Sequence, residues 1–263
     1  MSYKQLTPIF NLDEFERKPR FINGFYKKDI LSVSQFSKDD LDYVFSRAKE
    51  MMEMVEKWGT CDLLKGYTLA CVFYEPSTRT SSSFIAAMER LGGKVIPITE
   101  GIQYSSVSKG ESLIDSMITL EQYCDVIVLR HPQIGSSAMA AKHVNVPIIN
   151  AGDGAGEHPT QALLDLFTIK NELDCIDGLR VAMVGDLRYG RTVHSLTQLL
   201  SQYDVSLRYV SPETLRLPME LMNMLIDKGI DVRESHKIED VIETTDVLYV
   251  TRIQKERFPD ITQ

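Results

Sequence analysis

The chain has 263 residues, of which 43% are hydrophobic and 25% are charged, a composition typical of ordinary globular proteins. This length allows one large domain or two modest ones. The formal net charge of −8 argues against a general nucleic-acid-binding protein, which needs a basic surface, but it allows a local basic pocket for a small anion.

The N-terminus and the cysteines favour a cytoplasmic protein with no membrane segment, and the histidines argue against a metal site. Met1–Phe10 contains no long apolar core, and no stretch reaches the roughly 18–20 apolar residues that cross a bilayer. The four cysteines are widely spaced without a CxxC pair, which is typical of reduced thiols. The five histidines show no HExxH or similar spacing, so we expect neither a metal nor another cofactor.

Helices and strands alternate along the chain, after a polar and mixed segment at residues 1–24 that is expected to form a surface arm. Short apolar runs predict strands, and apolar residues three and four positions apart predict helices. The predicted strands are 69–74, 94–98, 125–129, 146–149, 180–185, 205–210 and 247–250. The predicted helices are 37–58, a segment near 84–91, 111–123, 136–143, one that starts at Pro159, 192–203 and 218–228.

This alternation in both halves predicts an α/β protein with two doubly wound parallel-sheet domains. The glycine-rich stretch Gly152–Gly156 predicts a hinge between them, because its displaced third glycine makes it a poor dinucleotide-binding motif. Only a polar segment follows the last predicted strand, so the second domain is expected to be incomplete at its C-terminus. The predicted divisions are the arm at 1–24, a first domain at 25–155 and a second at 156–263.

Hydroxyl residues and one arginine occur in Glu75–Phe84, where a predicted strand passes into a predicted helix. The free N–H groups at a helix start favour an anion, and Arg79 and the hydroxyls add hydrogen-bond donors. The alternative interpretation is a Ser/Thr-rich helix cap with Arg79 in solvent. Ligands of doubly wound sheets bind beyond the carboxyl ends of strands, where Ser77, Arg130 and Arg191 are expected.

Two further motifs leave several interpretations open. Gly185–Thr192 imitates a phosphate-binding GxxxxGK[ST] loop, but Arg191 replaces the lysine and Asp186 adds a negative charge, so a carboxylate suits Arg191 better than a nucleotide does. His158 precedes a predicted helix start, where a lone histidine is usually structural. Its spacing leaves a Ser–His–acid triad open, although no GxSxG motif supports one. Lys109 lies in a polar loop, where a solvated surface lysine is the ordinary interpretation.

Five strings in this order resemble the aspartate carbamoyltransferase family over nearly the whole chain. They are Glu75–Thr80, Arg130–Pro132, His158–Gln161, Gly190–Ser195 and Thr251–Arg257. The resemblance implies transfer of a carbamoyl group from carbamoyl phosphate to L-aspartate, the committed step of de novo pyrimidine synthesis, with no covalent intermediate. It also implies a homotrimer with shared active sites, and it leaves a regulatory or fused partner open.

The resemblance further implies roles for individual residues. Carbamoyl phosphate would be bound by Ser77, Thr78, Arg79, Thr80, Arg130, His158 and Gln161, and aspartate by Lys109, Arg191, Arg252 and Gln254. The residues implied in catalysis are Arg79, Thr80, Lys109, Arg130 and His158. The loop with Ser105 and Lys109 would reach a neighbouring subunit, and Glu75 would bridge to Arg191 and Arg257 in a closed form.

Two other functions compete with this interpretation. An ornithine carbamoyltransferase would share the carbamoyl phosphate site, but paired arginines suit a dicarboxylate better than a cationic amino acid. An inactive chain that keeps only the fold is the second alternative. The family continues beyond the position of Gln263 with a further loop and helix, so weak activity or low stability is expected for this chain.

Overall fold

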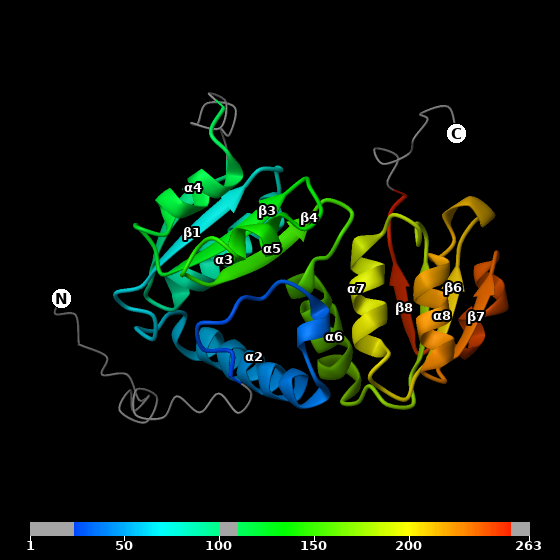
Figure 1. Cartoon of the computed structure of the whole chain (residues 1–263). Coiled ribbons are helices and arrows are strands. Elements are labelled where there is room, and N and C mark those ends of the chain that lie inside the picture. The colour runs from blue at the N-terminus through cyan, green and yellow to red at the C-terminus, as the bar shows by residue number, and fades with distance from the viewer. Residues whose placement is uncertain (1–23, 100–109, 254–263) are drawn as a thin grey trace. The chain divides into compact units, whose positions relative to one another are not determined.

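The computed structural model describes residues 24–99 and 110–253 of the chain (Figure 1). The described residues divide into two compact units. Unit 1 contains 24–30, 39–99, 110–130 and 137–149, and unit 2 contains 31–38, 131–136 and 150–253. Each unit has one four-stranded parallel sheet with helices, which confirms the predicted α/β class with two parallel-sheet domains. The predicted arm lies outside the described residues except for Gly24.

The sheet of unit 1 has the strand order β2-β1-β3-β4. Its strands are β1 (Thr68–Phe73), β2 (Lys94–Ile98), β3 (Val126–His131) and β4 (Ile148–Asp153). The central strand β1 is buried from Leu69 to Phe73, because it has a neighbouring strand at each edge and packing on both faces. This double burial explains why β1 is a continuous apolar run in the sequence.

The helices of this half begin and end close to their predicted positions, with one exception. They are α2 (Lys38–Trp58), α3 (Thr78–Arg90), α4 (Leu113–Leu120) and α5 (Ser136–Ala141). Helix α3 starts at Thr78, ahead of the predicted start near Phe84. Ser81 and Ser83 fit inside the helix because their hydroxyls donate to the backbone carbonyls of Ser77 and Thr80.

Strand β4 is longer than predicted and includes the first part of the expected hinge. It runs to Asp153, so Gly152 and Asp153 belong to a strand. The Asp153 carboxylate accepts hydrogen bonds from the N–H groups of Gly135 and Glu157, at 2.8 and 2.7 Å. The turn that follows is therefore organised by a buried carboxylate, and the hinge at Gly152–Gly156 stays a prediction.

The sheet of unit 2 has the strand order β7-β6-β5-β8. Its strands are β5 (Arg180–Val184), β6 (Ser206–Val210), β7 (Asp231–Ser235) and β8 (Val247–Val250). The sequence pattern misses β7, because this edge strand exposes Asp231, Arg233 and Glu234 and so lacks an apolar run. Its parallel pairing with β6, from Ser206–Asp231 to Val210–Ser235, identifies it as a strand.

Helices and short turns cover the sheet of unit 2. The helices are α6 (Pro159–Leu173), α7 (Arg191–Leu200) and α8 (Met219–Asp227), and two 3-10 turns lie at Ile238–Asp240 and Ile242–Thr244. Val241, between the two turns, packs against Ala182 of β5 and Val210 of β6. Within residues 24–99 and 110–253, no helix has the length and apolar character to span a membrane.

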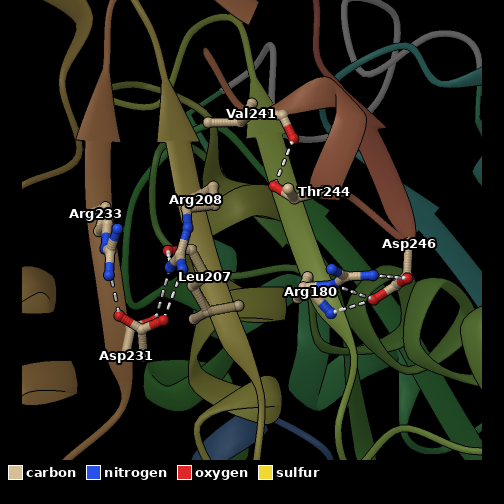
Figure 2. Close-up of polar contacts among 8 residues, drawn as sticks. All are labelled: Arg180, Leu207, Arg208, Asp231, Arg233, Val241, Thr244 and Asp246. Atoms are coloured by element: carbon tan, nitrogen blue, oxygen red, sulfur yellow. Dashed lines mark hydrogen bonds and ion pairs between the residues drawn. The ribbon is translucent and has the colours of Figure 1, made fainter.

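Ion pairs join neighbouring strands of this sheet (Figure 2). Arg180, the first residue of β5, makes a two-pronged contact with Asp246, just before β8, at 2.8 and 2.9 Å. Asp231 of β7 accepts from Arg208 of β6 at 2.6 Å and lies 3.7 Å from Arg233. These contacts favour the observed strand register, and the hydrogen bonds from Arg180 lower the pKa of Asp246 to about 2.

Candidate functional site

Both sheets contain a point at which the strand order reverses direction. In unit 1 the chain passes from β1 to the outer strand β2 and then returns to β3, on the other side of β1. In unit 2 it passes from β5 through β6 and β7 and returns to β8, on the other side of β5. Ligands of α/β sheets bind beyond the carboxyl ends of the strands at such switch points. The ends of β1 and β3, and those of β5 and β8, are therefore candidate sites.

The segment after β1 leads into an uncapped helix. Ser77 is the N-cap residue of α3, but among the described residues its side chain makes no capping hydrogen bond. Thr78, Arg79 and Thr80 form the first helical positions, and the Arg79 side chain is exposed. This arrangement favours the anion-binding interpretation over the simple helix cap, because the first N–H groups of a helix attract negative charge.

Arg130 lies beside this segment, near the end of β3. It pairs with Phe73 in the sheet register, and its backbone carbonyl accepts from the N–H of Tyr74 at 2.8 Å. Its side chain is only 14% exposed, and Nε lies 3.5 Å from Oε2 of Glu75. The structure therefore brings Glu75, the start of α3 and Arg130 together at the switch point of unit 1.

The switch point of unit 2 depends on a close backbone approach. Gly185 follows β5 with φ +122°, and a Cβ atom there would lie 2.2 Å from the carbonyl oxygen of Thr251. The N–H of Thr251 donates to the carbonyl of Val184 at 2.9 Å. Only glycine accommodates this approach, and it places the exposed Arg252 directly beyond the paired ends of β5 and β8.

The loop between β5 and α7 does not form a phosphate cradle. Asp186 is completely buried, and its Oδ1 accepts from the N–H of Tyr189 at 2.9 Å. This carboxylate therefore accepts a backbone N–H that a phosphate loop would offer to its anion. The geometry therefore agrees with the sequence argument against a nucleotide at this position.

Arg191 is the first residue of α7 and is 7% exposed. Its Nη1 donates to the carbonyl of Gly154 at 2.5 Å, in the turn after β4. Gly154 has φ +56°, and a Cβ atom there would lie 2.2 Å from the Pro132 carbonyl oxygen. A guanidinium has five N–H donors, so one bond to the backbone orients Arg191 and is compatible with carboxylate binding.

His158 is the N-cap residue of α6 and is 5% exposed. Its backbone N–H donates to Oγ of Ser195 on α7 at 3.4 Å, and its ring Nδ1 lies 3.5 Å from Oγ1 of Thr160. The Ser195 hydroxyl therefore meets the backbone of His158. A serine nucleophile activated by His158 stays an open interpretation.

Gln161 belongs to a hydrogen-bonded set with Asp165 and Tyr249, two residues that the sequence motifs did not indicate. Its Nε2 donates to Oδ1 of Asp165 at 2.9 Å, and the hydroxyl of Tyr249 donates to Oδ2 of the same carboxylate at 3.0 Å. Burial raises the pKa of Asp165 above its ordinary value, and the hydrogen bonds from Gln161 and Tyr249 reduce this shift. The spacing of Gln161 and Asp165, one helical turn apart, is a sequence signal for this pair. Nothing local in the sequence indicates Tyr249.

The structure thus groups the predicted site residues into two sets. Unit 1 carries Glu75, Ser77, Thr78, Arg79, Thr80 and Arg130, and unit 2 carries His158, Gln161, Arg191 and Arg252. Ser105, Lys109, Gln254 and Arg257 lie outside the described residues. Within residues 24–99 and 110–253, no three His, Cys, Asp or Glu residues are arranged to hold a metal ion.

Two family models match the chain in succession. The first, "Aspartate/ornithine carbamoyltransferase, carbamoyl-P binding domain", matches residues 28–171, and the second, the "Asp/Orn binding domain" of the same family, matches residues 177–263. The boundary between the two family models lies between residues 171 and 177, whereas the longest segment of unit 2 begins at Asn150. The predicted boundary at 155/156 stays a prediction.

Relatives and solved structures agree with this match. The chain is 54% identical to the aspartate carbamoyltransferase catalytic subunit of Leptospira biflexa, over 90% of the chain and 76% of that protein. It is also 54% identical to the multifunctional protein CAD of Squalus acanthias, over 90% of the chain. The chain spans 10% of CAD and 11% of a second multifunctional relative, the pyr1-3 protein of Dictyostelium discoideum.

Two solved structures resemble the fold of this chain closely. The catalytic subunit of M. jannaschii aspartate transcarbamoylase superimposes with a TM-score of 0.84 at 50% identity, over 89% of this chain and 77% of that one. Trypanosoma cruzi aspartate transcarbamoylase, in complex with carbamoyl aspartate and phosphate, gives a TM-score of 0.84 at 42% identity over the same shares.

Proposed function

Since this chain belongs to the aspartate/ornithine carbamoyltransferase family, we propose that it transfers the carbamoyl group of carbamoyl phosphate to the amine of L-aspartate. The products are N-carbamoyl-L-aspartate and phosphate, in the committed step of de novo pyrimidine synthesis. The observation that carries the proposal is the placement of cationic residues at both switch points. Arg130 lies beside the uncapped start of α3, and Arg191 and Arg252 follow β5 and β8.

Carbamoyl phosphate is the ligand proposed for the residues of unit 1. Its phosphate group accepts hydrogen bonds from the first N–H groups of α3 and from the hydroxyls of Ser77, Thr78 and Thr80. Arg79 and Arg130 supply charge-assisted donors, and a guanidinium matches the geometry of phosphate oxygens. His158 and Gln161, at the start of α6, are proposed to contact the carbamoyl group.

L-aspartate is the ligand proposed for the arginines of unit 2. Its two carboxylates suit two guanidinium groups, Arg191 and Arg252, while the side-chain amine of ornithine would meet repulsion there. Lys109 and Gln254 are proposed as further contacts to aspartate. The bond from Arg191 to Gly154 keeps its guanidinium in one orientation, so little side-chain entropy is lost when a carboxylate binds.

The reaction needs donors at the position where negative charge develops. The neutral amine of aspartate attacks the carbonyl carbon of carbamoyl phosphate, and an oxyanion forms. As the oxyanion collapses, the bond from carbon to the phosphate oxygen breaks, and the departing phosphate takes the proton that the amine loses. We assign the stabilisation of that oxyanion to Thr80, Arg130 and His158, since each such donor contributes about 3–4 kcal/mol in comparable acyl-transfer sites. This chemistry requires no covalent intermediate with the protein.

We further propose a cytoplasmic homotrimer in which the loop with Ser105 and Lys109 completes the site of a neighbouring subunit. Mixing inactive Lys109→Ala and Arg79→Ala proteins should regenerate some complete sites and restore part of the activity. No recovery in verified mixed trimers would argue against shared sites. A fused partner is a reasonable expectation, because two relatives of the chain are multifunctional proteins.

The test of the proposed function is product formation from labelled carbamoyl phosphate. The purified protein should convert aspartate to labelled N-carbamoyl-aspartate and should leave ornithine unchanged, whereas Arg79→Ala should be strongly impaired. Labelled citrulline from ornithine would support the alternative substrate. Binding of carbamoyl phosphate without any product from either amino acid would indicate an inactive chain that keeps the fold.

A further inference from the structure

A chain of hydrogen-bonded side chains in unit 2 lies next to Gln161. Asp165, one turn further along α6, accepts from Gln161 Nε2 at 2.9 Å and from the Tyr249 hydroxyl at 3.0 Å, each through a different oxygen. Thr192, in the first turn of α7, adds a side-chain hydrogen bond to Tyr249. These contacts link the start of α6 to β8 and to the start of α7, and none of the proposed substrate contacts uses Asp165 or Tyr249.

The Asp165 carboxylate decides which end of the Gln161 amide points toward it. The oxygen and nitrogen ends of a glutamine amide have nearly the same shape, so packing alone does not distinguish them. An ionised carboxylate only accepts hydrogen bonds, and it therefore attracts the NH2 end and repels the carbonyl end. With Nε2 held by Asp165, Oε1 forms the opposite end of the amide, and that end is a hydrogen-bond acceptor.

Donors meet both oxygens of the Asp165 carboxylate. Burial raises the pKa of Asp165 above its ordinary value, and the hydrogen bonds from Gln161 and Tyr249 oppose this shift because they favour the ionised, accepting form. Burial and the charge of Asp165 raise the pKa of Tyr249, so its phenol remains a donor. Both carboxylate oxygens therefore face donors, one on the same helix and one on β8.

We propose that Asp165, anchored by Tyr249, is a positioning residue that holds the carbonyl oxygen of Gln161 toward the N–H of the carbamoyl group. The inference rests on the proposed function, which places Gln161 at that group. An acceptor there recognises the NH2 of carbamoyl phosphate. It disfavours acyl phosphates with a methyl group in that place, such as acetyl phosphate, because the Gln161 acceptor would then face no donor.

The test compares carbamoyl phosphate with inorganic phosphate as ligands of the whole protein. Asp165→Asn keeps the shape of the side chain but can present either oxygen or nitrogen, so it no longer selects one end of the Gln161 amide. We expect this variant to bind carbamoyl phosphate about 10- to 30-fold more weakly in calorimetry. Binding of inorganic phosphate should change by less than about twofold, since phosphate has no NH2 group.

A double-mutant cycle separates positioning from a general structural role. In the Gln161→Ala background, Asp165→Asn should change carbamoyl phosphate binding by less than about twofold, because the residue acts through Gln161. Tyr249→Phe should give a smaller loss with the same dependence on Gln161, and it provides the test if Asp165→Asn fails to fold. Glu172→Gln, at an exposed position on the same helix, should bind both ligands as the unchanged protein does.

Three results would overturn the positioning role: an equal loss of carbamoyl phosphate and phosphate binding, the same loss with and without Gln161, or no loss in either variant. Failure of the proposed function has a different signature, because the unchanged protein would then either not bind carbamoyl phosphate or bind it without forming N-carbamoyl-aspartate. If the unchanged protein binds carbamoyl phosphate and turns it over, but the effects of Asp165→Asn and Gln161→Ala are additive, only the positioning role of Asp165 is rejected.

Discussion

Arg130 and Glu75 form an ion pair beside the start of α3, with 3.5 Å between Nε and Oε2. Backbone pairing brings the two residues together, because β3 lies next to β1 and the Tyr74 N–H donates to the Arg130 carbonyl. The carboxylate partly neutralises the guanidinium that is proposed to bind phosphate. The role of Glu75 as a bridge to Arg191 and Arg257 in a closed form stays a prediction.

Glu75→Gln should therefore strengthen the binding of inorganic phosphate. Removing the negative charge leaves Arg130 more electropositive, and the partly exposed position limits the expected gain to about three- to tenfold in affinity. Calorimetric titration with phosphate measures the gain in affinity. In an Arg130→Ala background, Glu75→Gln should give no such gain. Unchanged or weaker phosphate binding in Glu75→Gln would show that the pair does not compete with the ligand.

Arg191→Ala should impair the use of aspartate far more than the binding of carbamoyl phosphate. Loss of a two-pronged charge-assisted contact is expected to raise the KM for aspartate about 100-fold or more. Arg188→Ala is the matched control, because Arg188 lies in the loop that precedes Arg191 and its side chain is exposed. Steady-state kinetics with each substrate varied separately checks the assignment, and equal loss for both substrates would contradict it.

Gly185→Ala should destabilise the protein and displace Arg252. The new Cβ atom would meet the Thr251 carbonyl oxygen at 2.2 Å, in addition to the strain of a positive φ. We expect a loss of about 2–4 kcal/mol in unfolding free energy. Gly178→Ala has the same kind of φ, +87°, but nothing within 4 Å, so it should cost only about 1 kcal/mol. Similar losses in both variants, measured by denaturant unfolding, would argue against the close approach.

Asp246→Asn should reduce stability in a way that depends on pH. Hydrogen bonds from Arg180 lower the pKa of Asp246 to about 2, below the ordinary aspartate value near 3.9. The ionised carboxylate therefore stabilises the folded state above the unfolded pKa, and this contribution is lost as the pH falls toward 2. Unfolding midpoints of the two proteins should differ at pH 7 and converge below about pH 4. A constant difference across this range would exclude ionisation of Asp246 as its cause.

The sequence alone determined the class of the fold and most of its elements. The apolar run that ends at Phe73 is a buried strand, and the spacing of Phe84, Met88 and Leu91 is that of a helix. Both patterns are local, because burial of one face or of both faces sets the period of the apolar residues. The strings around Arg79, Arg130 and Arg191 also identified the family, since each string lies within a few neighbouring residues. Strand β7 escaped this kind of inference because its exposed charged residues hide the strand period.

Only the tertiary structure decided the strand order and the contacts between distant residues. The orders β2-β1-β3-β4 and β7-β6-β5-β8 place the candidate residues at switch points, and strand order depends on pairings between distant segments that have no local signature. The same reason hid the contact of Asp165 with Tyr249, 84 residues away. Local periodicity specifies which segments are strands and helices, whereas packing of the whole chain specifies which side chains meet.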